Sequence, residues 1–244
     1  MTACSQVSEK ENPTSVSTSY NTLSQSFLDL IKQGKNTENI VNAYANIDLD
    51  ALESELNTHE KKLAFWINTY NGFIMQILSK NPELFEDRSA FYIETPINIG
   101  GETLTFDIIE HGIIRNSRWK YGLGYIKKLS AKPIEKKFRT DQKDGRVHFV
   151  LNCGAISCPP VAIYKPETLD AQMDKIIPAY LKTVTEVKDA KLITSPLFSW
   201  FRGDFGGKSG IKKFLANYGL WEDDKLKLEF GSYDWTLLLG NFVE

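Results

Sequence analysis

The fold of this chain depends most on one stretch, Arg146-Val-His-Phe-Val-Leu-Asn-Cys-Gly-Ala-Ile-Ser-Cys-Pro-Pro160. Residues 146–151 are apolar and β-branched and follow the turn pair Asp144-Gly145, so they predict a strand. Gly154 and Pro159-Pro160 then predict a sharp bend. A thiol on a rigid loop at the end of a strand is a common place for nucleophilic chemistry. The first cysteine of the stretch is therefore a candidate functional residue.

The composition is that of an ordinary globular chain. Its 244 residues are 42% hydrophobic and 25% charged, which is enough to bury a full core. The net charge of −2 creates no global field for nucleic acid, so no nucleic-acid partner is expected. No run approaches the roughly 18 apolar residues of a membrane-spanning helix. Three cysteines are too few for a disulfide-dense scaffold.

The N-terminal segment differs from the rest. Residues 1–20 are rich in Ser, Thr, Asn and Glu, which predicts a disordered polar tether. Within it, Thr2-Ala3-Cys4-Ser5 resembles the end of a bacterial lipoprotein signal, although the apolar segment that should precede it is missing. We therefore expect Cys4 to be lipidated and the protein to lie in the cell envelope, in the periplasm or as an outer-membrane lipoprotein. The alternative is a cytoplasmic protein with a frayed N-terminus.

Periodicity gives the elements of the remaining chain. Helical spacing of apolar residues predicts helices over 22–32, 48–56, 61–79, 107–115, 166–183 and 210–218. Alternation predicts a hairpin over 96–105, turning at Gly100-Gly101, and strands over 191–194 and 225–230. No internal repeat or linker interrupts residues 21–244. We predict a single α+β domain with a helix-rich shell around a small, mainly antiparallel sheet.

Glu110 is a second candidate functional residue. In a helix over 106–115 it falls inside the arc of apolar side chains. A carboxylate there is costly unless it is paired, so a buried partner is predicted. His111 and Arg115 lie one turn apart on the neighbouring face and can act together. The alternative is a capping box, in which Glu110 reaches back to the backbone of Asp107.

Cys153 has two competing interpretations. A nucleophilic thiol needs a lowered pKa, a base and oxyanion donors. On a straight strand His148 faces away from Cys153, so the base is either His148 after a turn or His111. Alternatively, Cys153 and Cys158 form a disulfide, which an oxidising envelope favours. One Cys-x4-Cys pair is a poor zinc signal, so no metal and no cofactor are predicted.

Five segments together resemble one known family, the domain-of-unknown-function family 547. They are Ala64-Phe-Trp-Ile-Asn-Thr-Tyr-Asn71, Ile109-Glu-His-Gly-Ile-Ile-Arg115, the stretch from Arg146 to Pro159, Trp200-Phe-Arg-Gly-Asp-Phe-Gly206 and Tyr233-Asp-Trp235. The resemblance covers roughly residues 63–235, in order and with the right spacing. The family has no assigned reaction, and its bacterial members often look secreted or lipid-anchored. One departure is Leu238, which stands where the family usually brings an Asn.

The resemblance also gives a fold analogy. A helix with Trp and Asn before a His-bearing strand is loosely similar to papain-like and transglutaminase-like folds. Those folds place a cysteine at the start of the helix, whereas this chain has Asn68 in that region. The analogy implies that Cys153 supplies the thiol from another position, or that the protein is a non-catalytic relative.

Two hypotheses on function follow. The first is a thiol-dependent hydrolase or acyl-transferase acting on an amide or ester of a small-molecule, peptide or glycan-linked substrate in the envelope. Its candidate residues are the nucleophile Cys153, the bases His148 and His111, the supporting Glu110, and the substrate-binding Arg115, Arg146, Asn68 and Asn152. The second is a non-enzymatic, lipid-anchored binding or scaffold module. There Glu110, Arg146 and His148 form a buried polar network and the cysteines are bonded or inert.

Overall fold

The computed structural model of the protein describes residues 19–223 and 225–243. In chain order its helices are α1 (Tyr20–Lys32), α2 (Glu38–Ala45), α3 (Leu49–Glu55), α4 (His59–Lys80), α5 (Arg88–Glu94), α6 (Pro133–Phe138), α7 (Leu169–Thr183), α8 (Leu197–Trp200) and α9 (Gly207–Asn217). Short 3₁₀ or π-helical segments carry the label η: η1 (Pro82–Phe85), η2 (Ile108–Ile114), η3 (Lys120–Gly122), η4 (Gly145–Phe149), η5 (Pro166–Thr168) and η6 (Arg202–Phe205). None of the described helices is long and apolar enough to cross a membrane.

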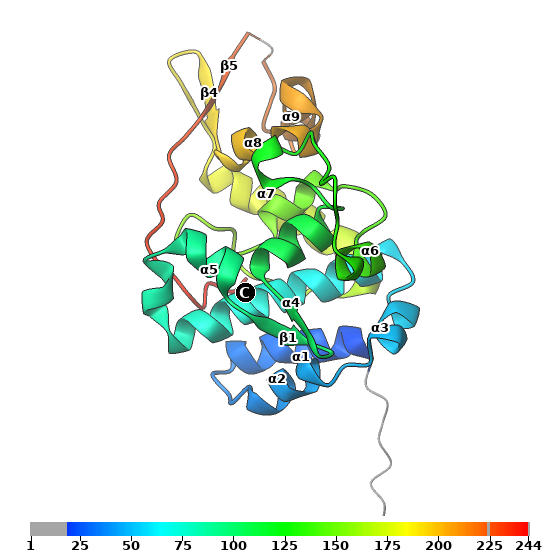
Figure 1. The fold of residues 1–244 in the computed structure, drawn as a ribbon. Coiled ribbons are helices and arrows are strands. Elements are labelled where there is room, and N and C mark those ends of the chain that lie inside the picture. The colour runs from blue at the N-terminus through cyan, green and yellow to red at the C-terminus, as the bar shows by residue number, and fades with distance from the viewer. Residues whose placement is uncertain (1–18, 224, 244) are drawn as a thin grey trace, which may run out of the picture.

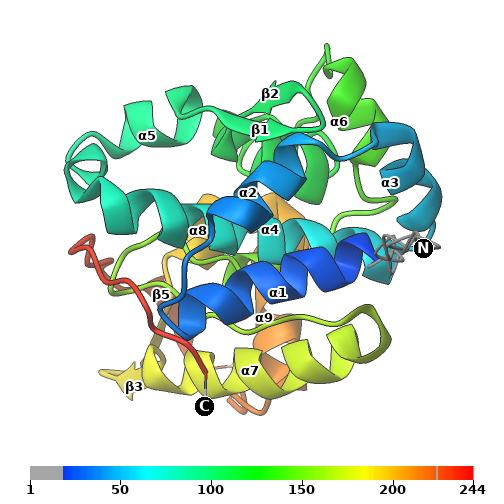
Figure 2. The same ribbon diagram turned by 90° about the horizontal axis from the view of Figure 1, so that it is seen from below.

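Helix α4 crosses the middle of the molecule. Figure 1 shows α1 and α2 on one side of it and α7, α8 and α9 on the other, and Figure 2 shows α1 lying along it. Every residue from 63 to 75 is buried, so this segment is enclosed on all sides and not only along the predicted apolar stripe. Gly72 allows the close crossing of α1, because a Cβ there would lie 2.5 Å from Phe27 Cδ1. The centre of the core is therefore this helix.

Two asparagines of α4 hydrogen-bond to the backbone of the loop that packs against it. Asn68 donates to the carbonyl of Tyr164 at 2.8 Å and accepts from its N–H at 2.9 Å. Asn71 likewise donates to the carbonyl of Val150 at 2.9 Å and accepts from the N–H of Asn152 at 2.8 Å. The amides thus replace the backbone partners that a neighbouring strand would provide, and they attach the loop over 150–164 to α4.

Two small sheets flank the helices. Strands β1 (Ile97–Ile99) and β2 (Glu102–Leu104) form the predicted hairpin, and both turn glycines, Gly100 and Gly101, have positive φ angles. Strands β3 (Glu186–Lys188) and β4 (Lys191–Thr194) are antiparallel, whereas β5 (Lys227–Phe230) pairs with β4 in parallel. The prediction of a single-domain α+β fold is confirmed, with one antiparallel and one mixed sheet.

The predicted helices are found with small shifts of their ends, but the predicted strand over 146–151 is wrong. Residues Gly145–Phe149 form the 3₁₀ segment η4. The side chain of Asp144 accepts from the N–H of Arg146 at 2.9 Å and also pairs with the Arg146 guanidinium. This local capping, together with the Asn71 contacts beyond it, satisfies the backbone without a partner strand.

The N-terminal prediction falls mostly outside the described residues. Residues 1–18, and Cys4 with them, are not among those described. Helix α1 begins at Tyr20, where the side chain of Ser19 caps it by accepting from the N–H of Thr22 at 3.1 Å.

Candidate functional site

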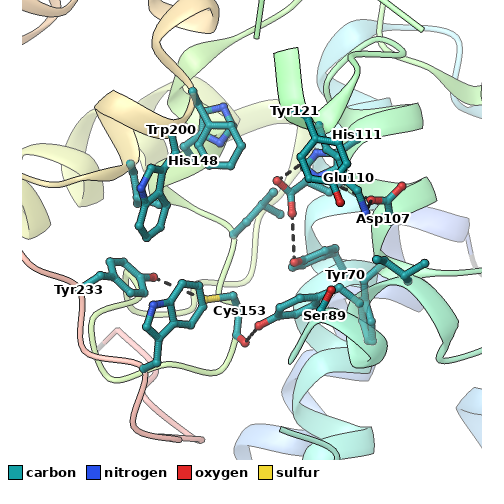
Figure 3. A pocket seen from close by; sticks show the side chains of 18 residues that line it. Tyr70, Ser89, Asp107, Glu110, His111, Tyr121, His148, Cys153, Trp200 and Tyr233 are labelled. Carbon is teal, nitrogen blue, oxygen red and sulfur yellow. Dashed lines mark hydrogen bonds and ion pairs between the residues drawn. The ribbon is translucent and has the colours of Figure 1, made fainter. Parts of the chain in front are cut away.

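A cavity of about 290 Å³ lies between α4, α5, η2, α8 and the C-terminal segment (Figure 3). Aromatic side chains form much of its wall: Tyr70, Tyr92, Phe106, Tyr121, Trp200, Phe201, Tyr233 and Trp235. Trp200 stacks on Trp235 at 5.8 Å between centroids, and Tyr233 contacts both. The cavity is thus predominantly apolar with a few polar groups, as small-molecule sites usually are.

The structure brings four of the sequence candidates to this cavity. Glu110, His111, His148 and Cys153 all line it. Figure 3 shows Cys153 on the opposite side from His148, with Glu110 and His111 on a third wall. Within the described part of the chain, no hydrogen bond joins the Cys153 sulfur to the other three. The carboxylate and the sulfur therefore share one pocket without touching.

Glu110 projects from η2, which is a π-helical segment. The wide turn is visible in the hydrogen bond from Arg115 N to Glu110 O at 2.8 Å. Its Oε2 accepts from the hydroxyl of Tyr70 at 3.2 Å. Asp107 at the start of the segment makes no side-chain cap, so the capping-box alternative is not observed. Burial raises the pKa of Glu110 to about 7, although Arg115 and Tyr70 oppose the rise.

His111 is held as a neutral acceptor. Arg115 Nη1 lies 2.8 Å from His111 Nδ1. Because a guanidinium can only donate, Nδ1 accepts and the ring proton is on Nε2. Glu110 Oε1 lies 3.3 Å from the same Nδ1 and so receives no N–H from it. Burial, reinforced by the charge of Arg115, lowers the pKa of His111 well below its ordinary value.

Asp204 joins Arg115 to His148. Its Oδ2 lies 2.8 Å from Arg115 Nε and 2.8 Å from His148 Nε2. Burial alone would raise the pKa of Asp204, but the hydrogen bond from His148 and the charge of Arg115 lower it. Burial lowers the pKa of His148 to about 4, against the opposing hydrogen bond of Asp204. The carboxylate is thus ionised and both histidines are neutral near neutral pH.

Phe201 covers this network on the cavity side. Its ring stacks on His148 with 3.8 Å between centroids and an interplanar angle of 6°. The guanidinium carbon of Arg115 lies 4.5 Å from the same centroid, in a cation–π contact. The charge of Arg115 is therefore compensated by Asp204 and shielded from the cavity.

The two cysteines of the loop form a disulfide in the structure. The N–H of Cys153 points at Cys158 Sγ at 3.0 Å, and the Tyr233 hydroxyl lies 3.4 Å and 3.1 Å from the two sulfurs. Tyr92 donates to the carbonyl of Cys153 at 2.7 Å. In this state Cys153 contributes a wall of the cavity and offers no thiolate.

None of the four predicted substrate-binding residues lines the cavity: Arg115 lies behind Phe201, and the other three lie elsewhere. Arg146, in η4, pairs with Asp144 at 2.7 Å and with Asp170 at 2.8 Å. Asn68 is fully buried against Tyr164, as described above. Asn152 donates to the carbonyl of Pro159 at 2.8 Å and accepts from the N–H of Gly154 at 2.9 Å. These side chains stabilise loops.

Several residues of the site were not assigned from the sequence. Asp204, Trp200 and Phe201 belong to one of the segments that carried the family resemblance, as do Tyr233 and Trp235 in the last one. In the sequence Asp204 stands between Phe201 and Phe205, much as Glu110 stands among isoleucines. A carboxylate in apolar surroundings was therefore the signal that could have identified it. Among the described residues, no group of three or more His, Cys, Asp or Glu side chains is placed to hold a metal ion.

The family model described as "Protein of unknown function, DUF547" matches residues 54–181, just over half of the chain. The chain belongs to this family. The DUF547 region contains the π-helical segment, His148 and both loop cysteines, whereas Asp204 and Tyr233 lie C-terminal to it. No curated protein and no solved structure matches the chain. Membership in the DUF547 family therefore adds no reaction to what the site suggests.

Proposed function

We propose that the protein is a binding module whose cavity takes a small organic cation that carries an apolar or aromatic group. The observation that carries this proposal is the position of Glu110, a carboxylate facing a largely aromatic cavity with one hydroxyl, that of Tyr70, donating to it. A carboxylate in such surroundings gains most from a cationic partner. The proposal develops the second of the two sequence hypotheses, the non-enzymatic binding module.

The charges around the cavity support a cation. Arg115 is compensated by Asp204 at 2.8 Å, and Lys120 is compensated by Asp107 at 3.0 Å. The two histidines are neutral because burial lowers their pKa values. Among the described residues that line the cavity, Glu110 is then the acidic group whose charge has no cationic partner of its own. Its ionisation leaves the site with an excess negative charge, which an ammonium group would neutralise.

The wall supports an apolar or aromatic body on the same ligand. Trp200, Tyr233 and Trp235 form one continuous aromatic surface across from the carboxylate. Aromatic faces attract cations within about 6 Å and also remove apolar surface from water. The volume of about 290 Å³ is at the small end of ligand sites, which favours a compact ligand.

Calorimetric titration with three ligands of matched shape tests the proposal: phenethylammonium, neutral 2-phenylethanol and anionic phenylacetate. We expect the cation to bind about tenfold more tightly than the alcohol, a difference of about 1.4 kcal/mol, and the anion to bind least. Glu110→Gln should remove the preference for the cation and leave the affinity for the alcohol unchanged. Glu102→Gln on the exposed hairpin is the matched control. Tightest binding of phenylacetate would overturn the proposal.

A thiol-dependent hydrolase or acyl-transferase is the second candidate, and it applies to the reduced chain. Its support is that Cys153 lines the same cavity as Glu110, His111 and His148. Two observations count against it. Cys153 is bonded to Cys158, and among the described residues no hydrogen bond joins the Cys153 sulfur to a histidine. Iodoacetamide labelling of the reduced chain at mildly acidic pH is the test. Rapid labelling of Cys153, slowed in His148→Gln, would favour this candidate.

The disulfide also supports the envelope location expected from the N-terminal segment. Structural disulfides persist in oxidising compartments such as the periplasm and are rare in the cytosol. We therefore propose that the protein acts in the cell envelope, held there by lipidation of Cys4. Fractionation of cells expressing the full-length protein, beside its Cys4→Ser variant, tests this location.

A further inference from the structure

The segment over 118–132 displays an unusual amount of apolar surface. Its large exposed side chains are Trp119, Tyr121, Leu123, Tyr125, Ile126 and Leu129. These are half of the large apolar residues that are exposed in the described part of the chain. Leu129 is fully exposed, at 107%, and Tyr121 is 68% exposed. Scattered exposed apolar residues are normal, but such a concentration on one segment marks an interaction surface.

This surface is built on an ordered loop. Arg118 and Lys127 form an antiparallel bridge, and Trp119 N donates to Ile126 O at 2.9 Å across the same loop. A contact from outside the loop holds its tip, because Gly203 N donates to Leu123 O at 2.7 Å. Leu123 itself adopts a left-handed φ of 50°, which is costly for a leucine and is retained where surrounding structure imposes it. The apolar side chains are therefore held outward.

The charge of the segment indicates what it meets. Residues 118–132 contain five Lys or Arg residues and no Asp or Glu, although the whole chain carries −2. Lys120 and Lys128 pair with Asp107 and Glu135, which belong to neighbouring segments. Lys127 and Lys132 are exposed and form no ion pair with any described residue. Protein surfaces that lie in a membrane interface have this composition, with Trp, Tyr and Leu beside lysines that form no ion pair.

We propose that residues 118–132 dock this protein on an anionic lipid surface. The apolar side chains would enter the boundary between headgroups and acyl chains, and Lys127 and Lys132 would contact acidic headgroups. A second copy of the chain is the other occupant to consider. It fits less well, because a two-fold contact through this surface would bring its unpaired lysines together. Tyr121 also lines the cavity, but the residues changed in the test below, Lys127, Leu129 and Lys132, do not.

Vesicle co-sedimentation of the full chain tests the proposal, with Cys4→Ser in every arm so that no lipid anchor contributes. We expect binding to vesicles of phosphatidylcholine mixed with phosphatidylglycerol, and much weaker binding to phosphatidylcholine alone. Each exposed lysine near the surface should contribute about fivefold in affinity, so Lys127→Ala with Lys132→Ala should cost about 25-fold. Leu129→Glu should lower binding at least as strongly, because it places a carboxylate where an apolar side chain would enter the membrane interface.

Matched controls come from other faces of the molecule. Leu84→Glu changes a leucine that is 38% exposed outside the segment, and Lys35→Ala with Lys188→Ala removes two exposed lysines elsewhere. These variants should bind like the parent. The proposal is overturned if the acidic vesicles do not bind the parent, or if the control and segment variants lose binding equally. Light scattering that shows a concentration-dependent dimer, lost in Leu129→Glu, without vesicle binding would instead assign the surface to self-association.

Discussion

Arg115 donates from Nε to Asp204 Oδ2 at 2.8 Å, although the two residues are 89 positions apart in the chain. Their side chains are 1% and 2% exposed. Removing one partner of such a pair leaves the other charge buried without compensation, which costs about 3–5 kcal/mol. We therefore expect Asp204→Asn to lower the free energy of unfolding by about that amount, measured by urea denaturation.

The control for this prediction is Asp141→Asn. Asp141 also pairs with a cation, Lys62, at 2.8 Å, but its side chain is 63% exposed. Exposed pairs contribute less than about 1 kcal/mol, so this variant should unfold almost like the parent. Equal effects of the two substitutions would show that the Arg115–Asp204 pair is not enclosed.

Asn71 gives a second prediction on stability. Asn71→Ala removes the donor to Val150 O and the acceptor of Asn152 N, and both backbone groups lie in buried residues. Each unsatisfied group costs about 1–3 kcal/mol, so we expect a loss of about 3 kcal/mol in the free energy of unfolding. Asn81→Ala, on the exposed end of α4, is the control and should cost less than about 1 kcal/mol. A small effect at Asn71 would mean that the loop is held by other contacts.

The disulfide gives a third prediction. The sequence has three cysteines, so the unreduced chain unfolded in denaturant should show one free thiol, that of an unmodified Cys4, and the reduced chain three. Because the closed loop is short, replacing both loop cysteines by serine should cost only about 2 kcal/mol by the chain-entropy relation. Thiol counting with Ellman's reagent and urea denaturation measure the two quantities. Three thiols without reductant would contradict the disulfide and revive the thiol-dependent candidate.

The sequence predicted the elements whose pattern is local. Helices over 61–79 and 166–183 and the hairpin at Gly100-Gly101 follow from spacing and turn chemistry alone, and the structure has them. The segment over 146–151 has the composition of a strand, but its partners come from Asp144 and from Asn71 on a distant helix. A side-chain amide that replaces a neighbouring strand leaves no periodic signal in the sequence.

The candidate site was predictable in part for the same reason. Glu110 was identified because it interrupts an arc of apolar side chains, and His111 because it lies one turn from Arg115 on the neighbouring face; both line the cavity. The hydrogen bond between Asp204 and Arg115 forms only after folding brings together residues 89 positions apart, so no local pattern predicts that they pair. Arg146 was predicted to bind the charge of a substrate, but it does not line the cavity and pairs with Asp144 and Asp170.

The raised pKa of Glu110 gives a prediction with a defined sign. Burial raises this pKa from 4.5 to about 7, so the folded protein keeps a proton that the unfolded chain releases above about pH 4.5. The resulting stabilisation is present at low pH and is lost as the pH rises through 7. We expect Glu110→Gln to be more stable relative to the parent at about pH 8 than at about pH 5, by at most about 3 kcal/mol.

Taking the difference between the two proteins separates this effect from that of His148. His148, whose pKa burial lowers to about 4, destabilises the folded state as the pH falls below about 6.5, but it does so in both proteins. Glu102→Gln, which changes an exposed side chain on the hairpin, is the matched control. Urea denaturation of the three proteins across this pH range measures the differences. A constant difference between Glu110→Gln and the parent would mean that Glu110 ionises like a solvent-exposed glutamate, and the preference of the cavity for a cation would lose its basis.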